Sequence, residues 1–538
     1  MHTPRVLAFV ALLAGCSSTP PSGDDLGGHR REVSSASPAA RAAVERGLVL
    51  LYAFNHDGAI EAFQEALRLD PSCPMAWWGI AHANGPHINN PEVSPERAKA
   101  GREAADQAIA LLGSATPVEQ ALIRAQDARF SRDPAAPRGP LDRAYAEAMD
   151  KAWEAHPQDP DVGTLRAEAL MDLQPWDLWD EAGRPKGATT IIVNTLEAVL
   201  RLQPDNPGAN HLYVHAMEAS PTPDKAQGAA DRLRTLVPGA GHLVHMPAHI
   251  DARLGHWGRA IEANQAAIEA DRRVAERTPK AGFYRLYMLH NHHFLAWAAM
   301  QAGRSELSLE AARAMVKGVP AEFIASSAPV VDGYMPVVLH VLVRFGKWDQ
   351  VLQEPAFPPE LIVANAVRHY ARGVALSALG RVDEAEAEAR ELAAWVAKID
   401  DRAMGNNPAR RVLEIPVRTL AGEIAFRKGD VDEAVAQLRQ AVAVENELRY
   451  DEPPDWMTTP RHPLAAILLS AGRHDQAREV LLADLRRFPE NGWALRGLVA
   501  ASAGEPSQRA EWEARFQRAW AGADVQIDTP CMCVPGAK

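Results

Sequence analysis

The stretch "RGLVLLYAFNHDGAIEAFQEALRLDP", from Arg46 to Pro71, has the clearest structural pattern in the sequence. Its apolar residues recur every three or four positions, which is the period of an amphipathic helix, and "NHDG" interrupts that pattern once. Small or aromatic residues stand at four regular places, namely Gly47, Ala59, Phe63 and Ala66. Small side chains let two antiparallel helices approach closely, so the stretch predicts a helical hairpin that ends near Pro71.

The same spacing of small residues returns further along the chain. It is present in "GVALSALGRVDEAEAEA" (Gly373, Gly380, Ala385), in "GEIAFRKGDVDEAVAQLRQA" (Gly422, Gly429, Ala434, Ala441) and in "AAILLSAGRHDQAREVLLADLRRFP" (Gly472, Ala477, Pro489). From Ala39 onward the pattern is helical almost throughout, and no sustained alternation of polar and apolar residues predicts strands.

These segments resemble tetratricopeptide repeats, and Trp77 stands where the next repeat of that family has its tryptophan. The resemblance implies an all-α fold, a right-handed solenoid of antiparallel helix pairs in which the first helix of each pair lines the concave surface. With a unit of about 34 residues, repeats are expected to start near Ala40, Pro74, Pro207, Gly241, Leu289, Asp332, Ala366, Ile415, Thr458 and Gly492.

The N-terminus has the parts of a secretory signal: an arginine, the apolar stretch from Val6 to Leu13, and small residues after it. "LAGC", at residues 13–16, resembles a bacterial lipobox, which implies cleavage before Cys16 and lipidation of that thiol. Because Ser17 rather than aspartate follows, we expect an outer-membrane anchor facing the periplasm. The apolar stretch is too short for an uncleaved membrane helix.

The pattern divides the chain into seven parts. They are a lipoprotein signal peptide (1–15), a flexible tether (16–38), N-terminal repeats (39–90), an irregular helical region whose loop can act as a lid (91–206), central histidine-rich repeats (207–322), C-terminal repeats (323–525) and a cysteine-containing tail (526–538). The net charge of −12 provides no basic surface for nucleic acid, and we expect contact with a membrane through the lipid alone.

Histidines gather in three consecutive expected repeats. In the resembled family the second, fifth, ninth and twelfth positions of a repeat face the groove. Those positions hold His211, His215 and Glu218, then His242, His245 and His249, then His290 and His293. Spacings of three, four and seven residues also place each group on one helix face. Elsewhere His56, His156, His256, His369 and His474 are expected at turns or on the surface.

Seven imidazoles and one carboxylate in one groove predict a metal site, because so many histidines would repel one another if they were protonated. The number of ligands exceeds one tetrahedral site and favours two or three ions, or one ion with further groups around it. Copper is the first choice, with iron and zinc as alternatives. Copper or iron would suit redox chemistry with Glu218 as ligand or proton acceptor, and zinc would suit hydrolysis.

Other residues are candidates for an accessory role at this site. They are His82, His87, Met246, His340, His462, Cys531 and Cys533. Each has a simpler reading as a packing residue, and the two tail cysteines can form a disulfide, hold a soft metal or lie in a disordered end. "PWDLWD" (175–180) and "NGPHINNP" (84–91) are either ordinary turns or walls over the groove.

The segments "HLVHMPAHI" and "HNHHF" resemble those of bacterial tetratricopeptide lipoproteins, a resemblance that implies no particular reaction. No CxxCH, HExxH or GxxxxGK[ST] motif is present. We therefore expect a metal-dependent oxidoreductase that acts on a small organic substrate. The alternatives are a scaffold that binds a peptide or envelope protein, and a metal store or chaperone.

Overall fold

The structure is a computed structural model that describes residues 25–277 and 282–534. The expected signal peptide and the lipidation site Cys16 lie outside the described residues, as does the end of the tail from residue 535. Among the residues described, no helix is both long and apolar enough to cross a bilayer.

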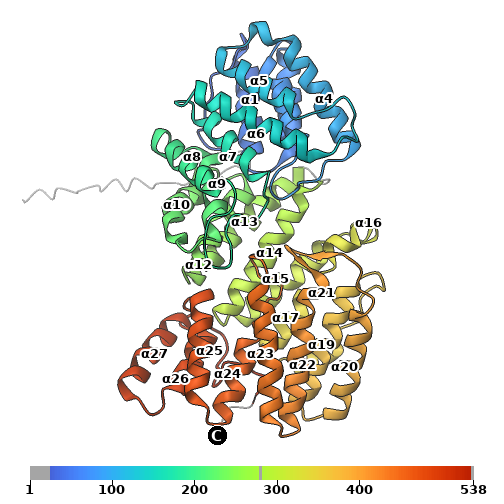
Figure 1. Ribbon diagram of the computed structural model, residues 1–538, viewed down its shortest axis with the longest axis vertical. Coiled ribbons are helices and arrows are strands. Elements are labelled where there is room, and N and C mark those ends of the chain that lie inside the picture. The colour runs from blue at the N-terminus through green and yellow to red at the C-terminus, as the bar shows by residue number, and fades with distance from the viewer. Residues whose placement is uncertain (1–24, 278–281, 535–538) are drawn as a thin grey trace, which may run out of the picture.

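The chain folds into antiparallel helix pairs, so the predicted all-α solenoid is confirmed (Figure 1). The first half contains α1 (Pro38–Tyr52), α2 (His56–Leu69), α3 (Pro74–Ala83), α4 (Pro95–Ala110), α5 (Pro117–Ala128), α6 (Arg138–Ala155), α7 (Pro160–Met171), α8 (Thr189–Leu202), α9 (Pro207–Glu218), α10 (Gln227–Leu236), α11 (Gly241–His245), α12 (Pro247–Arg253) and α13 (Trp257–Arg277). Two short 3₁₀ helices, η1 (Leu112–Ser114) and η2 (Pro223–Ala226), lie between them.

The second half contains α14 (Tyr284–Gln301), α15 (Ser305–Gly318), α16 (Ala321–Val331), α17 (Val337–Arg344), α18 (Trp348–Gln353), α19 (Ile362–Ala378), α20 (Val382–Val396), α21 (Ala409–Val412), α22 (Glu414–Arg427), α23 (Val431–Glu447), α24 (Arg461–Ser470), α25 (His474–Arg487), α26 (Gly492–Ala501) and α27 (Pro506–Ala519). A small antiparallel hairpin, β1 (Ala403–Met404) and β2 (Asn407–Pro408), precedes α21. Helices α3, α9, α11 and α26 begin at the predicted repeat starts.

The turn inside most pairs needs a residue with left-handed backbone. Gly380 (φ 77°) supplies it between α19 and α20, where the amide of Arg381 donates to the carbonyl of Leu376. In the first pair Phe54 (φ 55°) takes that place, and the amide of Asn55 donates to Leu50 in the same way. A large residue in this conformation is a strained exception to the repeat.

The C-terminal repeats curl back onto the central ones. The indole of Trp493 in α26 donates to the carbonyl of Met300 in α14 at 2.8 Å, and Trp257 donates to Pro489 at 2.9 Å. The amide of Ser305 donates to Asp524 beyond α27 at 2.7 Å. These contacts close the C-terminal half into a ring, while the N-terminal helices form the other end of the molecule (Figure 1).

The apolar interior has two parts that meet at the central repeats. One core extends from Val33 to Tyr287, and the other from Ala248 to Val534. Helices α12 and α14 contribute to both cores. The two halves therefore join at the histidine-rich segment.

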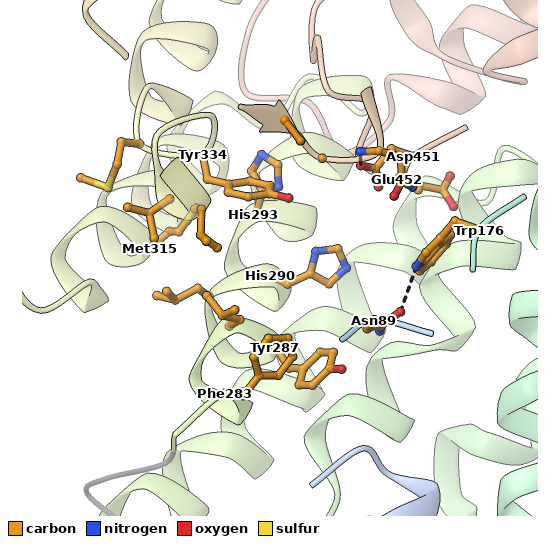
Figure 2. Close-up of a pocket in the computed structure, with 18 of the residues that line it drawn as sticks. Asn89, Trp176, Phe283, Tyr287, His290, His293, Met315, Tyr334, Asp451 and Glu452 are labelled. Atoms are coloured by element: carbon orange, nitrogen blue, oxygen red, sulfur yellow. Dashed lines mark hydrogen bonds between the residues drawn. The ribbon is translucent and has the colours of Figure 1, made fainter. Parts of the chain in front are cut away.

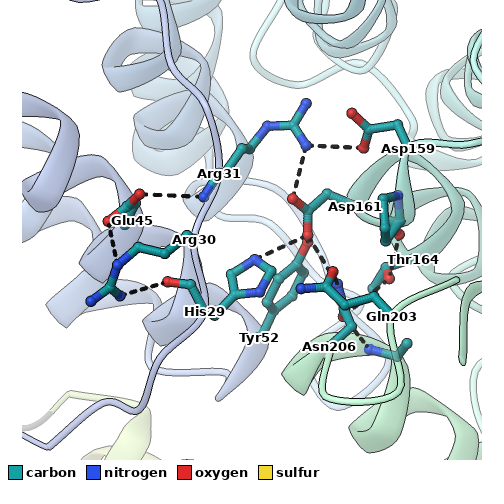
Figure 3. Close-up of polar contacts among 12 residues, drawn as sticks. His29, Arg30, Arg31, Glu45, Tyr52, Asp159, Asp161, Thr164, Gln203 and Asn206 are labelled. Atoms are coloured by element: carbon teal, nitrogen blue, oxygen red, sulfur yellow. Dashed lines mark hydrogen bonds and ion pairs between the residues drawn. The ribbon is translucent and has the colours of Figure 1, made fainter.

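Residues 25–37 are not the free tether that the sequence predicted, because ion pairs and hydrogen bonds hold them to the first half (Figure 3). The Arg31 guanidinium donates to both Asp161 (2.8 Å) and Asp159 (3.0 Å), and His29 lies 3.2 Å from Asp161. Asp161 also accepts from the hydroxyl of Tyr52 at 2.7 Å. The low content of apolar residues suggested disorder, but polar contacts with the start of α7 order this segment.

Candidate functional site

The first helices α9, α11, α12 and α14 carry the clustered histidines. Asn206 caps α9 by accepting from the amide of Ala209 at 2.8 Å, and Pro207 occupies the first turn. Pro247 divides the next first helix into α11 and α12, since proline removes an amide donor. The local sequence thus fixes where each helix starts, and with it the direction of each imidazole.

Six of the seven predicted histidines form two sets of three. Site A consists of His211, His215 and His242, and site B of His245, His249 and His290. In each set, one ring nitrogen from every histidine lies within 4.8 Å of the other two. The sets adjoin, because the ring centres of His242 and His245 are 6.1 Å apart.

Two pairs of nitrogens face each other at the distance expected around a shared ion. The Nε2 atoms of His211 and His242 are 3.1 Å apart, and those of His245 and His249 are 2.8 Å apart. Two nitrogens that each lie about 2.0–2.1 Å from one ion stand roughly 3 Å apart at ordinary bond angles. One pair in each site therefore has the separation of two ligands of one ion, which is also the separation of a hydrogen bond.

In two of these histidines the other ring nitrogen, Nδ1, already has a hydrogen-bond partner. His211 Nδ1 lies 2.7 Å from the carbonyl oxygen of Tyr52, and His245 Nδ1 lies 2.8 Å from Oδ1 of Asn264. The amide of Asn264 donates to Ala260, which leaves its oxygen facing His245. A proton fixed on Nδ1 directs the lone pair of Nε2 inward, as in the outer shell of imidazole metal sites.

Glu218 connects the two sites rather than standing free as a base. Its carboxylate lies 2.7 Å from Nδ1 of His215 in site A and 2.6 Å from Nδ1 of His249 in site B. Glu218 is fully buried, which opposes its ionisation, but its contacts with His249 and His215 lower its pKa to about 2. Glu218 is therefore an ionised bridge that orients one imidazole in each site.

A second carboxylate, Glu452, reaches site B from the loop between α23 and α24. It lies 3.3 Å from Nδ1 of His249, and with Glu218 it raises the pKa of His249 to about 10 against the effect of burial. Sequence reasoning missed Glu452, because nothing in "YDEPPDW" (450–456) indicates that the ring closure brings this loop to α12.

The remaining site imidazoles are neutral at ordinary pH. Burial lowers the pKa of four of them well below its usual value, and the positive charge that each would place on its neighbours lowers it further; these are His211, His242, His245 and His290. Neutral imidazole is the form that binds metal ions.

A cavity of about 500 Å³ adjoins both sites. His215, His242, His249 and His290 line one side, and apolar residues from α14 to α16 line much of the rest. Figure 2 shows Trp176 and Asn89, from two separate loops, meeting at its wall through a 3.1 Å hydrogen bond. The cavity can hold a small, largely apolar organic molecule beside the imidazoles.

Phe54 forms the wall of site A on the side away from this cavity. Its ring centre lies 4.5 Å from that of His211 and 5.5 Å from that of His242. On its other side lies His87, which stacks on His56 at 4.4 Å. His56 was expected at a turn or on the surface; it directly follows the turn between α1 and α2, but it is buried.

The structure does not bring the other candidates into the two sites. His293 lines the cavity but faces the sulfur of Met457 at 3.3 Å, and His340 packs against Trp456. His82 pairs with Glu168, His462 pairs with Asp484, Met246 packs in the N-terminal core, and Cys531 and Cys533 form a disulfide. Their spacing in the sequence gave no sign of these separate partners.

Comparison with known proteins identifies the repeat and nothing finer. A family described as "Tetratricopeptide repeat" matches residues 40–73, where α1 and α2 form the predicted first hairpin. No curated protein matches the chain.

Solved structures with similar folds include "Human IFIT1 dimer with m7Gppp-AAAA" (13% identity, 90% of both chains, TM-score 0.33). "Crystal structure of Ypp1" shares 8% identity over 92% of this chain and 82% of that one, with a TM-score of 0.44. "Crystal Structure of the Yeast Tom70" shares 14% identity over 90% and 92%, with a TM-score of 0.28.

Proposed function

We propose that this tetratricopeptide-repeat protein binds two metal ions, one in site A and one in site B, and uses them to oxidise or reduce a small organic molecule in the adjoining cavity. The observation that carries the proposal is the pair of three-histidine sets bridged by the buried carboxylate of Glu218. A peptide-binding groove has no need of six converging imidazoles.

The choice of metal follows from the ligands. Imidazole nitrogen suits copper, iron and zinc. Because the two sets of histidines are adjacent, they favour ions that can act together. Copper is the first choice for ligand sets rich in imidazole, and iron is the second. Redox-active ions held by these histidines would supply electron transfer with an organic molecule in the adjoining cavity, whose walls are largely apolar.

The protein's own residues have defined tasks in this proposal. Glu218 fixes the orientation of His215 and His249, and Glu452 places a second carboxyl group beside His249. Glu452 also lines the cavity, so its carboxyl group is placed to exchange a proton with a bound substrate.

The first test is elemental analysis of the protein after loading with copper, iron and zinc in competition, followed by dialysis. Two equivalents of copper or iron are expected. His245→Ala should lose one equivalent and His211→Ala the other, whereas His474→Ala, at an exposed position, should lose none. Oxygen uptake with a panel of small aromatic and aliphatic substrates then tests the reaction.

Retention of zinc alone, at two equivalents, would direct the search to hydrolysis. Absence of any retained metal would overturn the proposal and favour the second candidate, a scaffold that binds a peptide or protein partner. That alternative has the support of the tetratricopeptide-repeat fold. A metal store or chaperone would keep both equivalents and show no turnover.

We also propose that the protein is lipid-anchored in the cell envelope and faces the periplasm. The support is the sequence "LAGC" at residues 13–16. Wild-type protein expressed in bacteria should enter the membrane fraction, and Cys16→Ser should move it to the soluble fraction. An unchanged distribution would contradict the anchor.

A further inference from the structure

The C-terminal tail is packed into the second half of the protein and ends in a disulfide. Cys531 and Cys533 are joined, and Cys533 and Val534 are buried. The Arg427 guanidinium, at the end of α22, donates to the carbonyl of Cys533 at 2.6 Å. The disulfide is thus held against a defined part of the fold, and Cys531 is its more exposed member.

A buried carboxyl group with no hydrogen-bond partner lies beside this disulfide. Glu423 in α22 is 1% exposed, and neither of its carboxyl oxygens has a partner among the described residues. One of these oxygens and both cysteine sulfurs lie within 4.8 Å of one another. Buried polar groups without partners are rare in folded proteins, and each one needs an explanation.

We propose that Cys531 and Cys533 form a redox site that exchanges with an external dithiol, and that the Glu423 carboxyl group donates the proton to the sulfur that leaves. This activity is separate from the metal sites. The substrate class is a protein or small molecule with two neighbouring thiols.

The first step takes place at Cys531, because Cys531 is the more exposed of the two cysteines. A thiolate of the dithiol attacks Sγ of Cys531, a new S–S bond forms there, and the Cys531–Cys533 bond breaks. The electron pair goes to Sγ of Cys533, which takes the proton of Glu423. Glu423 then regains a proton from solvent, equal to the one that the attacking thiol lost on ionisation.

In the second step the reductant's free thiol attacks the reductant sulfur that is bonded to Cys531, and a disulfide forms within the reductant. The mixed disulfide breaks, Cys531 leaves as a thiolate and takes the proton that this second thiol gives up. The dithiol has then lost two electrons and two protons to become a disulfide, and the protein has gained two thiols.

The surroundings of Glu423 favour the protonated acid that the first step needs. Burial raises its pKa to about 7, and Arg427, one helical turn away, opposes that rise. Tyr370 on α19 also interacts electrostatically with Glu423. A carboxyl group with this pKa is matched to proton transfer near neutral pH.

The test is the rate at which dithiothreitol reduces the tail of the folded full-length protein at pH 6. Free thiols are trapped with a maleimide and assigned by peptide mass, which separates the tail from the buried Cys73. Glu423→Gln, which has the shape of the protonated acid, should slow reduction about 100-fold, at the low end of general acid catalysis. The difference should shrink at pH 9, where Glu423 is ionised.

Glu433→Gln, at an exposed carboxylate on α23, is the matched control and should react like the wild type. Glu423→Asp keeps the acid and should recover part of the rate, which separates proton donation from a general loss of packing. Equal rates for wild type and Glu423→Gln would overturn the role of Glu423. Reduction only under denaturing conditions would overturn the redox site itself.

Discussion

At the scale of single residues, the site depends on side chains that no repeat pattern requires. Phe54 takes the left-handed backbone that glycine supplies at other pair turns, at a cost of about 1–3 kcal/mol. Its ring contacts the imidazoles of site A at 4.5 to 6.1 Å. A strained residue whose ring packs on the candidate site indicates that the packing outweighs the backbone cost.

Replacement of Phe54 by glycine separates these two effects. Phe54→Gly relieves the backbone but removes a buried ring, so the free energy of unfolding should fall by about 2 kcal/mol overall. Metal affinity should fall in site A and stay unchanged in site B, whose histidines Phe54 does not contact. Chelator competition on His245→Ala and His211→Ala backgrounds measures each site alone. Equal losses in both sites would contradict the assignment of Phe54 to site A.

Glu218 should behave differently, because it contacts one histidine of each site. In Glu218→Gln the amide can accept from only one of the two imidazoles with its single oxygen. We expect metal affinity to fall by about 10- to 100-fold in both sites. The same chelator competition measures it, with the exposed Glu181→Gln as control. A loss confined to one site would show that Glu218 does not bridge them.

At the scale of elements, much was predictable from the sequence. The phase of the small residues placed the starts of α3, α9, α11 and α26 correctly, because close helix contact constrains those positions physically. The repeat phase also placed the seven histidines on neighbouring first helices, and six of them form the two sets in the structure. Burial was not predictable: His245 and His249 were expected to face the groove, but both are buried because Glu452 and α14 close over them.

The loops and the docked N-terminal segment were beyond sequence reasoning, because their partners are remote in the chain. Trp176 meets Asn89 across 87 positions, and Arg31 meets Asp161 across 130. Composition around such residues indicates a turn or a tether, and it contains no information about the surface on which the segment will lie.

The docked segment should be sensitive to acid. Burial opposes ionisation of Asp161, but His29 and Arg31 hold its pKa below the usual value. A depressed carboxyl pKa adds stability that is present above about pH 4 and is lost as the pH falls below it. Proteolysis within residues 25–37 should therefore accelerate below pH 4 in the wild type. Asp161→Asn should be cut rapidly at every pH, and protection equal to the wild type would contradict this.

At the scale of the whole molecule, the two proposed metal sites lie where the two apolar cores meet. Ring closure of the C-terminal half brings Glu452 to His249, and α14 carries His290 between the halves. An ion in site B would therefore be held by α11, α12 and α14, and its outer carboxylates would come from both halves of the chain.

Metal should consequently stabilise the whole protein. Free metal at 100 times Kd adds about 2.7 kcal/mol per site to the free energy of unfolding. We expect Tm to rise on loading, and two separate unfolding transitions in the metal-free protein to merge. The His211→Ala, His245→Ala double variant should show no rise, whereas His474→Ala should match the wild type. A rise in the double variant would place the metal elsewhere.

The docking of residues 25–37 limits how the protein can be oriented in the cell. If Cys16 bears a lipid, only the residues from Ser17 to Asp24 separate the membrane from a fixed point on the protein surface. Even a fully extended chain of that length spans no more than about 30 Å. The N-terminal repeats would then stay within one protein diameter of the bilayer. The protein could not diffuse across the periplasm to a distant partner.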